Sequence, residues 1–123
     1  MLFNLKFFSC VEKKLEKLRR NVLESVILLG TCSEKEDGAK ILISESYFDL
    51  MLKVLHDPNA GDQLQEQITF TLRKAVKHEL VGCYLLTNTT VPKDLQAFLG
   101  SASAKVSEII YELLDKLAVI QKF

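Results

Sequence analysis

This chain of 123 residues contains no tryptophan, two prolines, five glycines and three cysteines. Cys10, Cys32 and Cys83 form no Cys-x-x-Cys pair, which argues against a disulfide framework or a zinc site and favours free thiols in a reducing compartment. His56 and His78 have no cysteine or histidine at ligand spacing, so we expect no metal and no cofactor. Phosphate-binding glycine loops and the G-x-S-x-G and H-E-x-x-H motifs are missing, so we expect no catalytic residues and no enzyme.

The chain also lacks an excess of charge of either sign. Sixteen lysines and arginines balance sixteen aspartates and glutamates, so no global attraction to nucleic acid or to a membrane surface is expected. The apolar stretch 1–8 is too short to span a membrane and lacks a signal-cleavage pattern. We therefore expect a cytoplasmic protein with a protein or peptide partner, which neither binds nucleic acid nor inserts into a membrane.

What the chain does have is apolar residues at helical spacing along almost its whole length. Hydrophobic residues make up 48% of the chain, enough for one domain over 1–123. Long helices are predicted over about 10–31, from 62 through 75, and from the turn at 100–103 to about 121. Shorter helices are predicted over 39–44, 47–56, 79–86 and 91–99. We expect Ser46 with Asp49 to form a capping box, and Asp62 to be an N-cap with Gln65 three residues on.

The three long segments align at a period near forty residues. Their spacings are 45 and 42 residues when the equivalent positions are Leu23, Ile68 and Ile110, each followed four residues later by Ile27, Leu72 and Leu114. Such a helical period is typical of HEAT and armadillo solenoids, and three helices per unit favour armadillo. We predict an all-α, armadillo-like right-handed solenoid of about two and a third repeats. Its parts are an N-terminal cover or repeat remnant (1–9), the long helix of a partial repeat (10–37) and two repeats (38–78 and 79–123).

Some of these residues carry a resemblance to a known family. Residues 38–55 resemble the first two helices of an armadillo repeat, and Val91-Pro92 resembles the Ile-Pro that opens its second helix. Over about 20–118 the chain is similar to the last armadillo repeats of kinesin-associated proteins, the non-motor subunits of kinesin-2, at Val22-Leu23-Glu24, Gly30-Thr31, Ala39, Gln67-Ile68, Val76, His78 and from Leu114-Asp115 to Ala118. This resemblance implies a cargo or motor adaptor on microtubule and ciliary transport routes, associated with the cytoskeleton or the cilium.

Helix geometry predicts which surface would bind the partner. Because Ile68, Leu72 and Ala75 are expected to face inward, the rotation of 100° per residue places the opposite face of that helix toward the concave side of the solenoid. Repeat equivalence extends this face to the other two long helices. The predicted partner-binding residues are Glu66, Phe70 and Arg73, then Asn21, Ser25 and Leu28 on the first long helix, and Glu108, Glu112 and Asp115 on the last.

Several alternatives stay open at the sequence level. Phe70 suits a binding hot spot, but its ring would equally suit packing on a neighbouring long helix. The basic cluster is either a solvated face steadied by ion pairs such as Glu16 with Arg20, or a site for an acidic segment; its members are Lys13, Lys14, Lys17, Arg19 and Arg20. The chain is alternatively a HEAT-like scaffold of a signalling regulator, or a cytoskeletal dimerisation domain built on the apolar stripe of helix 10–31. The ends of so short an array would continue into a longer array or self-associate.

Overall fold

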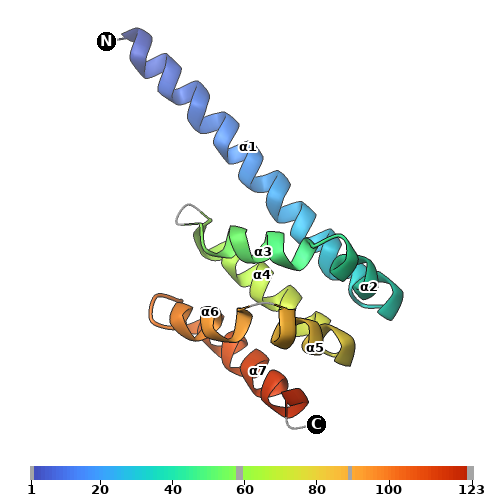
Figure 1. The fold of residues 1–123 in the computed structure, drawn as a ribbon. Coiled ribbons are helices and arrows are strands. Elements are labelled where there is room, and N and C mark those ends of the chain that lie inside the picture. The colour runs from blue at the N-terminus through green and yellow to red at the C-terminus, as the bar shows by residue number, and fades with distance from the viewer. Residues whose placement is uncertain (1, 58–59, 89, 122–123) are drawn as a thin grey trace.

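The computed structural model describes residues 2–57, 60–88 and 90–121, without the side chains of residues 2–12, 15, 16 and 19. Over these residues it is all-helical, with no strand, which confirms the all-α part of the prediction (Figure 1). The helices are α1 (Leu2–Cys32), α2 (Glu36–Ser44), α3 (Tyr47–Leu55), α4 (Gly61–Ala75), α5 (Glu79–Asn88), α6 (Val91–Phe98) and α7 (Ala104–Gln121). In the described part of the chain, no helix is long and apolar enough to cross a membrane.

The three long helices lie side by side, and the short helices form a second layer on one side of them (Figure 1). The central helix α4 packs against both α1 and α7. In the layer of short helices, α3 packs on α4, while α5 packs on α7 and on α2. The two ends of the chain lie at opposite edges of this arrangement, and the N-terminal half of α1 extends beyond its neighbours (Figure 1).

The core lies between the two layers. The predicted inward stripe of α4 is confirmed, since Ile68, Leu72 and Ala75 are fully buried. The short helices contribute Phe48, whose ring lies 6.3 Å from that of Tyr84 and so connects α3 to α5. Burying a large apolar side chain stabilises a fold by about 1.5–3 kcal/mol, so each fully buried side chain between the two layers contributes to the stability of the fold.

The helix starts differ from the predicted caps. Ser46 adopts φ 60°, a left-handed conformation, and its side chain caps nothing. The capping box is wrong because α2 and α3 are joined by two residues, and the Ser46 amide instead donates to the carbonyl of Ile43 to close the end of α2. Asp62 is not an N-cap either, because α4 begins at Gly61, and it lies in the first turn, where its charge suits the helix dipole.

The first helix starts earlier than expected. The backbone of α1 begins at Leu2 instead of near residue 10, since no proline or glycine interrupts residues 2–29. The boundary proposed between 1–9 and 10–37 therefore falls inside one helix. The side chains of 1–9 lie outside the described residues, so their role as a cover stays a prediction.

Residue depths bear on the alignment of the long helices. At the first predicted spacing of 45, Val26 and Gly30 correspond to Thr71 and Ala75, which are all buried, but the exposed Ile27 corresponds to the buried Leu72. That spacing stays a prediction. Where α1 meets α4, a Cβ added at Gly30 would lie 3.1 Å from the Thr71 hydroxyl oxygen. Matching depths then support the second spacing of 42, because Leu64, Ile68, Thr71 and Ala75 are buried like Val106, Ile110, Leu113 and Leu117.

Candidate functional site

The exposed side of the long helices, opposite the short ones, carries an aromatic ring held by a charged network. The Phe70 side chain is 40% exposed, and the Arg73 guanidinium lies 5.2 Å from the centre of its ring. The same guanidinium donates to the Glu112 carboxylate on α7 at 2.6 Å. Cation–π attraction and the ion pair together restrict Arg73, so Phe70 is presented beside a fixed charge. We name this surface, made by Ile27, Glu66, Phe70, Arg73, Lys105 and Glu112, the long-helix face.

A second ion pair joins α4 to α7 on this face. Lys105 Nζ of α7 lies 2.9 Å from Glu66 Oε1 of α4. The two ion pairs thus connect α4 to α7 at two places, one at Glu66 and the other at Arg73. Four predicted site residues are therefore brought together: Glu66, Phe70, Arg73 and Glu112. Glu108 and Asp115 are exposed, but at the spacing of 42 residues they correspond to Glu66 and Arg73. They therefore point to the side of α7 that no helix of the described chain covers.

The predicted contribution of α1 is misplaced. Asn21 and Ser25 line a groove on the side of the short helices, where the Ser25 hydroxyl donates to the Asn21 carbonyl at 2.8 Å. Leu28 is 66% exposed, and its placement on the long-helix face stays a prediction. The α1 residue on the long-helix face is Ile27, which is 45% exposed.

Helix rotation explains the placement of Ile27. Ile27 is the residue after the buried Val26, and Phe70 is the residue before the buried Thr71. The helices α1 and α4 run in the same direction (Figure 1). For parallel neighbours these steps turn both side chains toward the same side. The sequence pattern does not indicate Ile27 as a surface residue, because its spacing of four from Leu23 places it among the apolar anchors. Gly30 was the available signal, since a glycine inside a helix often marks close helix packing.

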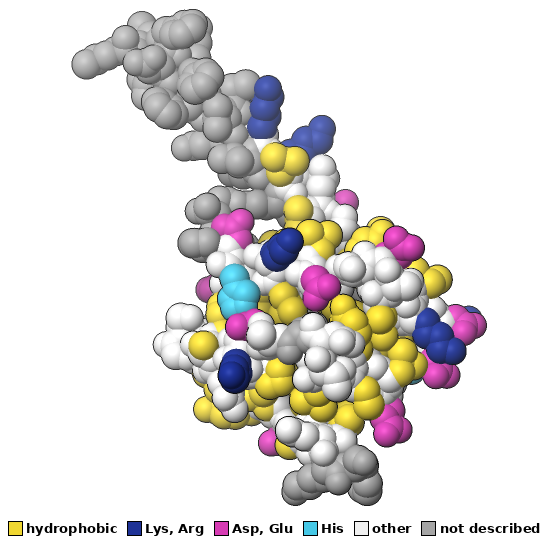
Figure 2. All heavy atoms as spheres, in the orientation of Figure 1, with side chains coloured by type: hydrophobic (Ala, Val, Ile, Leu, Met, Phe, Trp, Pro, Cys, Tyr) yellow, Lys and Arg dark blue, Asp and Glu magenta, His cyan; other side chains and the backbone are white. Residues whose placement is uncertain are grey.

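An apolar groove of about 310 Å³ separates α1 from α3. It is lined by Leu18, Asn21, Val22, Ser25, Val26, Leu29, Leu50, Met51 and Val54. Figure 2 shows apolar side chains at the surface along these helices and basic side chains farther out along α1. Lys13, Lys14, Lys17 and Arg20 are exposed, without an ion pair to any described side chain. Arg19, Glu12 and Glu16 lie outside the described side chains, so the role of the basic cluster stays a prediction.

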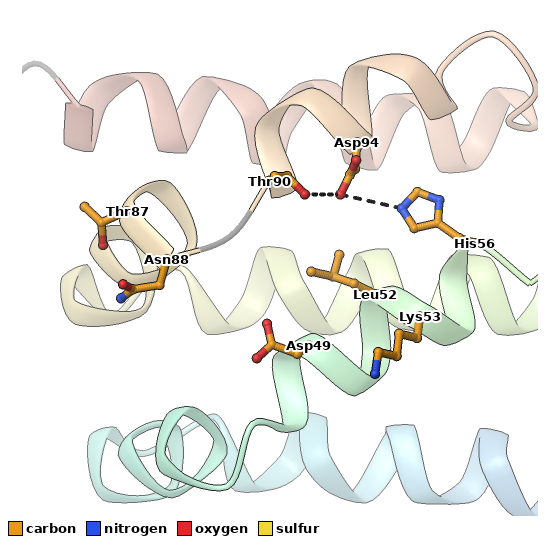
Figure 3. A pocket seen from close by; sticks show the side chains of 8 residues that line it. All are labelled: Asp49, Leu52, Lys53, His56, Thr87, Asn88, Thr90 and Asp94. Atoms are coloured by element: carbon orange, nitrogen blue, oxygen red, sulfur yellow. Dashed lines mark hydrogen bonds and ion pairs between the residues drawn. The ribbon is translucent and has the colours of Figure 1, made fainter.

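A more polar, open cleft of about 750 Å³ lies between α3 and the ends of α5 and α6 (Figure 3). Asp94 accepts a hydrogen bond of 2.8 Å from the Thr90 hydroxyl, and its carboxylate lies 3.7 Å from His56 Nε2. Asp49 accepts from the Tyr84 hydroxyl at 3.2 Å. Burial and the neighbouring Asp49 carboxylate raise the pKa of Tyr84. Two of these contacts join neighbouring helices: His56, which follows the last residue of α3, meets Asp94 of α6, and Asp49 of α3 meets Tyr84 of α5.

His78 has a comparable joining role, because its Nε2 lies 2.8 Å from the Ser33 carbonyl at the end of α1. Within the described ranges, no group of three or more His, Cys, Asp or Glu side chains is arranged to hold a metal ion. Comparisons with protein-family models, with curated proteins and with solved structures find no match to this chain. Among the surfaces described, the long-helix face is the one with an exposed aromatic ring beside charges fixed by ion pairs.

Proposed function

We propose that this chain is an armadillo-like helical-repeat module that binds another protein through the long-helix face and has no enzymatic activity of its own. Support for the repeat comes from two successive triplets, α2–α3–α4 and α5–α6–α7, each of two short helices followed by a long one. It also comes from the side-by-side packing of α1, α4 and α7 (Figure 1). In solenoids of stacked repeats, such a layer of long helices forms an extended binding surface.

The observation that carries the proposal is the setting of Phe70. A large ring that is 40% exposed adds apolar contact area at low entropic cost, because it has two side-chain torsions. Arg73 already holds one side of the ring, so little ordering remains for a partner to impose. The carboxylates of Glu66 and Glu112 are already paired with Lys105 and Arg73, so the charges around the ring balance and the face favours a partner segment that presents an apolar side chain.

The resemblance to kinesin-associated proteins suggests which partner to test first. An adaptor subunit joins motor tails to cargo, so we propose a cargo or motor adaptor of a kinesin-2-like motor. Purified kinesin-2 motor tails are the direct probe, and affinity capture from cytosol extends the search to other partners.

The test compares wild type with Phe70→Ala, and with Val119→Ala as the matched control. Val119 is also an exposed apolar residue of a long helix, at 56%, but lies outside the network around Arg73. We expect Phe70→Ala to weaken partner binding at least about tenfold, as for a hot spot, with little change in melting temperature. A loss of stability of about 3 kcal/mol or more would instead show that the ring is part of the core. Equal binding by both variants would also contradict the proposal.

A second candidate is a dimerisation or scaffold domain of a cytoskeletal or signalling regulator. It is favoured by the N-terminal half of α1, which projects beyond the other helices, and by the exposed Leu18 on its apolar stripe (Figure 1). An intermolecular seam along this stripe would make melting depend on protein concentration. Leu18→Lys should then abolish that dependence, whereas it should leave partner binding at Phe70 unchanged.

A further inference from the structure

Arg73 connects the exposed Phe70 ring to the neighbouring long helix. Its guanidinium lies over the ring, with 5.2 Å between Cζ and the ring centre. Its Nη1 donates to Glu112 Oε2 at 2.6 Å. Phe70 and Arg73 belong to α4, whereas Glu112 belongs to α7. The position of the arginine beside the ring therefore depends on how α7 packs on α4.

The exposure of this ion pair shows why Glu112 controls Arg73. The Arg73 side chain is 25% exposed and the Glu112 side chain 49%. An arginine at a surface loses much rotational freedom when it is held in one position. A charge-assisted hydrogen bond to a carboxylate offsets this loss and fixes the direction of the planar guanidinium. Without Glu112, the contacts printed for Arg73 among the described residues would reduce to the cation–π contact with Phe70, which is weak at an exposed site.

We propose that Glu112 is a positioning residue for the partner site, and that it couples partner binding to the packing of α7 on α4. The inference rests on the binding role proposed for Phe70, but it requires no contact between Glu112 and the partner. While α7 is packed, Glu112 holds Arg73 against the ring, and the partner meets a surface that is already ordered. When α7 moves away, Arg73 is released and its ordering opposes binding. Such coupling is reciprocal, so a bound partner stabilises the packed position of α7.

The neighbouring ion pair of α4 provides a matched control. Lys74 pairs with Glu34, which follows α1, as Arg73 pairs with Glu112 on α7. The exposed fractions are also similar, at 28% for Lys74 and 52% for Glu34. Glu34→Ala therefore removes an ion pair of the same kind at the adjacent residue of α4 and leaves Arg73 in place. Exposed ion pairs contribute little to folding, so Glu34→Ala and Glu112→Ala should both melt within a few degrees of wild type.

The first measurement needs no partner. NMR of protein labelled in its phenylalanine rings and arginine side chains reports on Phe70 and on the Nε–H bond of Arg73. Glu112→Ala should shift the Phe70 ring signals and lower the order parameter of this bond below about 0.6, the range of flexible groups. Glu34→Ala should leave both as in wild type.

The second measurement is a double-mutant cycle on the affinity for a purified kinesin-2 motor tail, by isothermal titration calorimetry. Glu112→Ala should weaken binding about threefold, as expected for loss of one exposed ion pair. It should have no further effect in the Phe70→Ala background, because Glu112 acts through the surroundings of the ring. Glu34→Ala should bind like wild type.

Hydrogen exchange tests the reciprocal effect. The bound motor tail should slow exchange of α7 amides around Leu113 and Leu117, which are buried, by about the same threefold factor. In Glu112→Ala this slowing should be lost.

Three results would overturn the inference. One is unchanged Phe70 and Arg73 signals in Glu112→Ala, whether or not the motor tail binds. Another is an equal loss of affinity in Glu34→Ala. The third is a loss that persists in the Phe70→Ala background, because Glu112 would then act on the partner independently of the ring. Failure of the proposed function is distinct: Phe70→Ala would bind as tightly as wild type, although the NMR signals still respond to Glu112→Ala.

Discussion

The hydroxyl of Thr71 is buried where α1 meets α4 and, in the described part of the molecule, has no hydrogen-bond partner. An unpaired buried hydroxyl costs about 1–3 kcal/mol of desolvation, and valine has the same shape without it. We expect Thr71→Val to raise the free energy of unfolding by about 1 kcal/mol, and the melting temperature by roughly 4 °C. Thermal melting by circular dichroism measures the change.

Thr69 is the matched control for Thr71, because it is equally buried in the same helix but donates to the Gln65 carbonyl at 2.9 Å. Thr69→Val removes a satisfied hydrogen bond, so it should not stabilise the protein. A melting temperature that falls in Thr71→Val, or rises equally in both variants, would contradict this account of the orphan hydroxyl.

Glu34 should titrate below its ordinary range. A hydrogen bond from Lys74 and the attraction of its charge lower the pKa of Glu34 from the ordinary value of 4.5. Because the folded-state pKa is the lower one, the stabilising effect is complete above pH 4.5 and is lost as the pH falls through the folded-state value. NMR titration of the carboxyl group should show a midpoint below 4.5 in wild type that moves back toward it in Lys74→Met. An unchanged midpoint would mean that this surface pair does not persist in solution.

Residue depths could be predicted from sequence better than residue partners. The stripe Leu64, Ile68, Leu72 and Ala75 follows from spacing alone, because helix rotation determines which positions share a face. Which charges pair across helices depends on the separation and register of two helices, so Arg73 with Glu112 could not be anticipated. The prediction of Phe70 at the surface was possible since its neighbours at helical spacing are polar.

Among the elements, the junction between α1 and α2 is the tightest. Gly38 lies in the first turns of α2, and a Cβ there would overlap the carbonyl oxygen of Cys32. Because that atom is backbone, relief requires α1 and α2 to move apart, and we expect Gly38→Ala to cost about 2 kcal/mol or more in the free energy of unfolding. Urea unfolding measures this cost.

Gly82 of α5 provides the comparison for Gly38. An added Cβ there meets the end of the Ile120 side chain, which can rotate away. Alanine also favours a helix over glycine by about 1 kcal/mol, which offsets part of the crowding. Gly82→Ala should therefore stay within about 1 kcal/mol of wild type. Equal losses in the free energy of unfolding of the two variants would show that overlap with the Cys32 carbonyl does not determine the cost of Gly38→Ala.

Element boundaries followed from sequence where turn residues mark them. The helices predicted over 47–56 and from 62 correspond to α3 and α4, and Val91-Pro92 opens α6 as predicted. The start of α1 and the left-handed conformation of Ser46 could not be predicted, because each depends on the structure of the adjacent residues of the chain. The placement of Asn21 and Ser25 beside α3 did not follow either, because α1 has apolar residues in more than one register and packing decides which of them meet the neighbouring helices.

At the scale of the whole molecule, stability should be greatest at the centre of the row of long helices. α4 packs against α1, α3 and α7, whereas α1 and α7 each pack on one long helix of the described chain. In a row of helices, the local stability of each is set largely by its contacts with immediate neighbours. Opening α4 breaks contacts on both sides, but opening the outer part of α1 breaks few, so α4 should open only when the whole domain unfolds.

Native-state hydrogen exchange tests this gradient. We expect amides of α4 around Ile68 and Leu72 to exchange at least about tenfold more slowly than those of α1 around Leu18, with α7 in between. Ile68→Ala should lower the free energy of unfolding by about 3 kcal/mol and remove protection from α4, α1 and α7 together, because it empties a fully buried site that the row shares. Leu28→Ala, at an exposed position of α1, should leave the α4 rates unchanged. Slowest exchange in α1 or α7 would mean that the central helix does not hold the molecule together.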